Sequence, residues 1–158
     1  MPPRTASCAS EWWGAPLPAD DDATGGSRRL VVNVDGGSRG NPGPAAAAAV
    51  ATTPDGEVIE RRGERLGEAT NNVAEYRAVL LGIDLARELG ASELELVGDS
   101  ELIVRQIKGE YKVKDPGLKP LSSEVRQALE SFDSWSIRHV RREDNEAADL
   151  LVNETLDD

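Results

Sequence analysis

Residues 30–44 read LVVNVDGGSRGNPGP, and this stretch decides how the rest of the chain is interpreted. Residues 30–34 are apolar except for Asn33, which is typical of a central strand buried on both sides. The strand ends at Asp35, and residues 36–44 have turn chemistry throughout. The chain must therefore fold back, and the alanine-rich residues 45–50 are predicted to form a second strand of small side chains.

Further strands and helices follow in alternation. The predicted strands are residues 57–66, 93–97 and 134–140, and the predicted helices are residues 72–89, 100–107, 118–131 and 145–156. The fourth strand runs into Asp99, so it also finishes on an aspartate. The order βββαβααβα predicts an α/β fold with a mixed five-stranded sheet and helices on both faces.

Composition narrows the class of protein. The chain has 158 residues, which suits one domain, expected at residues 28–158, and no apolar run is long enough to span a membrane. Residues 1–27 have no apolar period and no secretory signal, so they are predicted to be a disordered leader on a cytoplasmic protein. Within the leader, Trp12 and Trp13 are either a short docking motif or an incidental apolar spot. The single cysteine, Cys8, can form no internal disulfide.

The net charge of −11 is unexpected for a protein that binds nucleic acid, because phosphates are usually contacted by Lys and Arg. Several acids lie near the two ends of the chain, and carboxylates that hold divalent cations become phosphate-binding sites. The 14 arginines outnumber the 4 lysines. This acidic, lysine-poor composition is consistent with a high-salt organism or with a GC-rich genome.

Four acidic residues are candidates for a common site. Asp35 and Asp99 follow strands, at the sheet edge where α/β proteins bind ligands, although each could be an ordinary turn or cap residue. Glu75 could cap its own helix from the third position, but it also lies on the face that packs against the sheet. Asp149 is flanked by alanines and leucines in the last helix. Spacing alone does not show whether the four converge.

Residues 30–156 resemble the type 1 ribonuclease H family in four motifs that occur in the family's order. The chain is similar to the compact prokaryotic form, which lacks a long basic protrusion. The motifs are Asp35 to Pro44 (DGGSRGNPGP), Thr70 to Glu75 (TNNVAE), Asp99 with Ser100 (DS), and Asn145 to Asp149 (NEAAD).

This resemblance implies that Asp35, Glu75, Asp99 and Asp149 bind two Mg²⁺ ions, with Mn²⁺ as a possible substitute. The implied activity is endonucleolytic hydrolysis of the RNA strand of an RNA/DNA hybrid, leaving 5'-phosphate and 3'-hydroxyl ends, by a protein expected to be a monomer. The alternative is a non-catalytic module of the same fold that binds hybrid or RNA. The four retained acids argue against that alternative.

Substrate contacts are also implied by the resemblance. Asn41 and Asn71 are expected in the minor groove of the hybrid, and the implied contacts also include Gly36, Ser38 and Ser100. Glu101 departs from the family pattern, in which Gln is frequent, and a carboxylate cannot donate a hydrogen bond to a base.

The connector between the second and third helices carries Lys108, Lys112 and Lys114, which form either a reduced phosphate-contact site or a solvated loop. Two residues compete for a role in turnover. Arg142 precedes Asp149 by seven residues and lies in a loop, as in compact members, so it is favoured. His139 has the ten-residue spacing of other members, but strand alternation predicts that its side chain packs inward.

Overall fold

The computed structural model describes residues 28–158. The predictions for the leader, including Trp12 and Trp13, concern residues outside this range. The strands are β1 (Arg29–Ser38), β2 (Gly43–Thr52), β3 (Val58–Ala69), β4 (Glu93–Gly98) and β5 (Ser134–His139). The helices are α1 (Asn71–Glu88), α2 (Glu101–Lys108), α3 (Lys119–Leu129) and α4 (Glu146–Asp157), with a short 3₁₀ helix, η1, over Arg142–Asp144.

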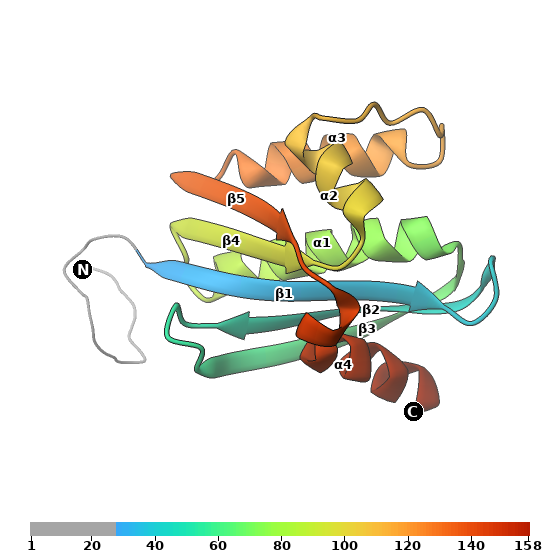
Figure 1. The fold of residues 1–158 in the computed structure, drawn as a ribbon, viewed down its shortest axis with the longest axis horizontal. Helices are drawn as coiled ribbons and strands as arrows, with labels where there is room; N and C mark the ends of the chain where they lie inside the picture. Colours follow the sequence, from blue (N-terminus) through green and yellow to red (C-terminus); the bar gives the residue numbers. More distant parts are fainter. Residues whose placement is uncertain (1–27) are drawn as a thin grey trace.

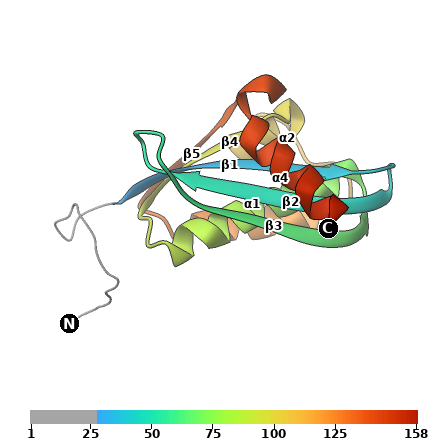
Figure 2. The same cartoon turned by 90° about the horizontal axis from the view of Figure 1, so that it is seen from below.

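The strands form one mixed sheet in the order β3-β2-β1-β4-β5. β1 pairs antiparallel with β2 and parallel with β4. Helices α1 and α3 lie on one face of the sheet and α4 on the other, as Figures 1 and 2 show. The predicted fold class and element order are confirmed. Within residues 28–158, no helix is long and apolar enough to cross a membrane.

The alanines of β2 let helices approach both faces of the sheet. Ala47, Ala49 and Ala51 belong to the main core with α1, whereas Ala46 and Ala48 pack with Val152 of α4. Side chains alternate between the two faces along a strand, so this run of alanines serves both layers. A strand of small residues therefore places α1 and α4 close to β1, which lies next to β2 in the sheet.

Two local predictions are wrong. β1 does not end at Asp35 but continues to Ser38, because residues 36–38 remain paired with β2. His139 is exposed rather than packed inward. It lies on the same strand face as the buried Ile137, but only Ile137 is buried along β5. Alternation identifies the face of an edge strand, and it does not show how far helices cover that face.

Candidate active site

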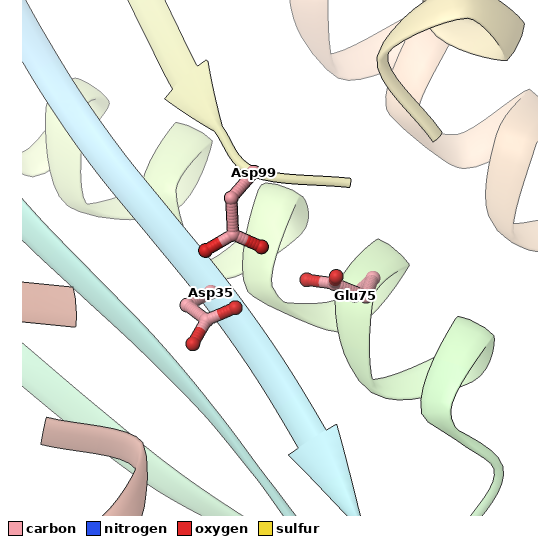
Figure 3. A group of neighbouring side chains, drawn as sticks. All are labelled: Asp35, Glu75 and Asp99. Atoms are coloured by element: carbon pink, nitrogen blue, oxygen red, sulfur yellow. The ribbon is translucent and has the colours of Figure 1, made fainter. Parts of the chain in front are cut away.

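Three acidic side chains converge beside the C-terminal end of β4. Asp35 comes from β1, Glu75 from α1 and Asp99 from the residue after β4, and their carboxylates point toward one another in Figure 3. One carboxylate oxygen of each lies within 4.8 Å of the other two. The backbone therefore brings together residues that are as much as 64 positions apart in the sequence.

The parallel pairing of β1 with β4 stops at Val34, immediately before Asp35. The backbone N–H of Arg39 donates to Pro44 of β2, so the N–H groups of residues 36 and 38 point to the opposite edge. Side chains of α1 take the place of β4 there. Glu75 Oε1 accepts from Gly36 N at 2.9 Å, and Asn71 Oδ1 accepts from Ser38 N at 3.2 Å.

Glu75 therefore faces the sheet and does not cap its own helix. The N-cap is Thr70, whose side chain accepts from the N–H of Val73. Close packing of α1 on β1 depends on Gly36, because a Cβ at that position would lie 2.1 Å from the Ala74 carbonyl oxygen. The glycine after Asp35 thus allows Glu75 to reach the strand backbone.

Asp149 of α4 and Arg142 of η1 complete the charged surroundings. Both line a cleft of about 180 Å³ together with Asp35, Glu75 and Asn71. The charge of Asp149 contributes to raising the pKa of Asp35, and the charge of Arg142 contributes to lowering the pKa of Glu75. Asp149 thus acts electrostatically on Asp35, and Arg142 acts on Glu75.

Burial is the largest cause of the raised pKa values of Asp35 and Glu75. It raises the pKa of Asp35 to about 8, with further contributions from the charges of Glu75, Asp99 and Asp149. Burial also raises the pKa of Glu75 to about 7, although the hydrogen bond from Gly36 N opposes this. Carboxylates crowded in this way are stabilised by a cation. An all-oxygen donor set fits a hard divalent ion such as Mg²⁺.

Asn145 is a residue of the site whose role sequence reasoning missed. Its side chain is 1% exposed, and its amide Nδ2 donates to the Val34 carbonyl oxygen at 2.9 Å and to Asp99 Oδ2 at 3.1 Å. Its Oδ1 accepts from Asn33 Nδ2 at 2.9 Å. Asn33, the one polar residue among residues 30–34, was the signal in the sequence for this role.

The two asparagines expected to contact substrate lie next to each other. Asn41 Oδ1 accepts from the backbone N–H of Asn71 at 3.1 Å. The side-chain oxygens of both residues are thus held by the protein, since Asn71 Oδ1 is bound to Ser38 N. Within residues 28–158 neither side-chain Nδ2 donates a hydrogen bond, so both amide groups can donate to a ligand.

The remaining candidates lie at the N-cap of α2, on α2, or in the connector that follows α2. Ser100 is the N-cap of α2 and accepts from the N–H of Ile103 at 3.5 Å. Glu101 is exposed and accepts from Arg105 Nε at 2.9 Å. The connector between α2 and α3 is short. Lys108, the last residue of α2, is exposed, as are Lys112 and Lys114 of the connector. Roles for these residues in binding substrate stay predictions.

Fold and site together define a ribonuclease H-like domain with an acidic centre suited to metal. A family model described as reverse transcriptase-like matches residues 33–155. The chain is 46% identical over 130 residues to ribonuclease HI of Halobacterium salinarum, a match that covers 82% of this chain and 65% of that protein. The chain belongs to the ribonuclease HI family.

Solved structures agree with this assignment. The crystal structure of ribonuclease H1 from H. salinarum matches with a TM-score of 0.80 and 44% identity, covering 82% of this chain and 98% of that one. LC11-RNase H1, crystallised in complex with an RNA/DNA hybrid, matches with a TM-score of 0.78 and 39% identity over 81% of this chain and 96% of that one.

Proposed function

We propose that this protein hydrolyses the RNA strand of RNA/DNA hybrids. The observation that carries the proposal is the convergence of Asp35, Glu75 and Asp99, with Asp149 beside them, on a fold shared with ribonucleases HI. The similarity to LC11-RNase H1, which was crystallised with a hybrid, supports the choice of substrate.

The carboxylates of Asp35, Glu75, Asp99 and Asp149 would hold two Mg²⁺ ions, with Mn²⁺ as a substitute. Bound there, the ions would supply Lewis-acid activation of the attacking water and of the departing 3'-oxygen, which leaves 5'-phosphate and 3'-hydroxyl ends. The protein itself provides rigid placement of the four carboxylates on β1, α1, α4 and the end of β4.

Recognition of the hybrid follows from the two asparagines beside the acids. Because their side-chain oxygens are held by backbone N–H groups, the amides of Asn41 and Asn71 present N–H donors outward. The minor groove offers base acceptors to such donors, and the 2'-hydroxyl distinguishes RNA from DNA. Arg142 would lie near a phosphate oxygen, where its charge would help the product to leave.

The test is a comparison of matched RNA/DNA, DNA/DNA and RNA/RNA duplexes, with and without Mg²⁺. Metal-dependent cleavage confined to the RNA strand of the hybrid is the expected result. Asp35→Asn keeps the size of the side chain and removes a charge, so it should abolish cleavage while the fold is retained. Hybrid binding by the wild type without cleavage would favour the binding-module alternative.

A further inference from the structure

The hydrogen bonds around Asn145 connect three of the elements that carry the acids. Its side chain reaches β1 at the Val34 carbonyl, next to Asp35, and reaches Asp99 directly after β4. Its own backbone carbonyl accepts from Asp149 N at 3.1 Å, which is the first hydrogen bond of α4. One buried side chain thus connects the middle of β1 and the residue after β4 with the start of α4.

The direction of these hydrogen bonds is determined by chemistry. A carbonyl oxygen and a carboxylate can only accept, so Nδ2 of Asn145 must face Val34 and Asp99. Oδ1 then points the other way and needs a donor. Asn33 Nδ2 supplies it at 2.9 Å. Without this donor the buried Oδ1 would be left unsatisfied, so the Asn145 side chain would shift to bring Oδ1 to another donor, which weakens its hydrogen bond to Asp99.

We propose that Asn33 is a positioning residue that orients Asn145 and, through it, the Asp99 carboxylate for metal binding. This inference rests on the proposed function, because it concerns the same carboxylates. One oxygen of Asp99 is held by Asn145, and the other is available to a cation. Asn33 lies in β1 two residues before Asp35, so it acts on Asp99 without belonging to the acid cluster.

The test is a calorimetric titration of the full chain with Mg²⁺, comparing wild type with Asn33→Leu. Leucine has a similar size and cannot donate a hydrogen bond. Partners that orient metal ligands typically change metal affinity by 10–100-fold, so we expect the dissociation constant for Mg²⁺ to rise roughly 10-fold. Unchanged affinity in the folded variant would overturn the proposal.

Thr52→Val is the matched control. Thr52 Oγ1 donates to the Val31 carbonyl oxygen at 3.1 Å, and the substitution removes a part-buried hydrogen bond from the same sheet without touching the acids. We expect its Mg²⁺ affinity to stay within roughly twofold of wild type, since distant sites act independently. An equal loss of affinity in both variants would show a general effect of sheet damage and would refute the positioning role.

A second readout separates positioning from substrate binding. The Mg²⁺ concentration needed for half-maximal cleavage should rise in Asn33→Leu, while KM for the hybrid at saturating Mg²⁺ should stay constant. If the wild type cleaves no hybrid, the proposed function fails, yet the calorimetric titration still decides the inference. If cleavage is normal and Mg²⁺ affinity is insensitive to Asn33, only the inference fails.

If Asn33→Leu does not fold, nuclear magnetic resonance of the wild type tests the proposal instead. The side-chain amide signals of Asn145 should shift during titration with Mg²⁺. Gln106, which is also buried but is bonded to the Tyr76 hydroxyl, is the internal control and should shift less. An Asn145 signal that does not respond to Mg²⁺ would overturn the proposal.

Discussion

Gly36→Ala tests whether contact between α1 and β1 builds the site. The new Cβ would lie 2.1 Å from the Ala74 carbonyl oxygen, against about 3.4 Å for an ordinary contact, so helix and strand would have to separate by about 1.3 Å. Overpacking of this kind costs about 1–3 kcal/mol. The separation also weakens the hydrogen bond from Gly36 N to Glu75, and hydrogen bonds to charged groups contribute about 1.5–3 kcal/mol.

We therefore expect Gly36→Ala to lower the free energy of unfolding by about 3 kcal/mol and Tm by roughly 10 °C. Gly37→Ala is the matched control, because its Cβ would meet nothing nearer than Val152 Cγ1 at 3.7 Å. Its stability should stay within about 0.5 kcal/mol of wild type. Urea unfolding and Mg²⁺ titration measure both effects. Equal stability and equal Mg²⁺ affinity in the two variants would refute the close-packing argument.

The remaining predictions concern charge. The pKa of Asp35 is raised from 3.8 to about 8, so the folded chain holds a proton that the unfolded chain releases, and without metal its stability should fall as pH rises from about 4 to 8. In melting curves, Asp35→Asn should reduce the fall of Tm with rising pH and should be more stable than the wild type at pH 8. A fall of Tm with pH identical to that of the wild type would show that Asp35 is not its cause. Arg142→Ala should lower steady-state turnover on hybrid severalfold with Tm unchanged, because the side chain is exposed. His139 is also exposed, so His139→Ala should leave Tm within about 2 °C of wild type. A loss of rate larger than that of Arg142→Ala would identify the histidine as the residue that assists turnover.

Much of the fold was predictable because its signals are local. Apolar spacing located α1, Gly90 marks its end with a positive φ of 82°, and the predicted start of the next helix at Ser100 agrees with the N-cap of α2. The extension of β1 was missed for the opposite reason. Glycine-rich turn chemistry is a local signal, whereas pairing of residues 35–38 with β2 is a property of the sheet.

The site was predictable as a set of residue types and not as a geometry. The motifs pointed to Asp35, Glu75 and Asp99. Predicting that they converge requires the order of strands in the sheet and the packing of α1 on β1. The bond between Asn33 and Asn145 joins residues 112 positions apart, and no local pattern indicates such a pair. His139 shows a further limit, since its burial depends on how far the helices extend over β5.

Along residues 36–38, side chains of α1 accept the backbone hydrogen bonds of β1 that a neighbouring strand would otherwise accept. The site therefore closes only when segments far apart in the sequence have come together. The contacts that close the site span 39 residues from Gly36 to Glu75, 46 from Asp99 to Asn145 and 112 from Asn33 to Asn145. Contacts of such separation form only after the entropy of closing long loops has been overcome. A nascent chain that has folded β1 to β4 holds three of the acids but lacks the amide that orients Asp99. The proposed metal binding therefore reaches its native strength only after α4, which follows β1 to β4 along the chain, has packed on the sheet.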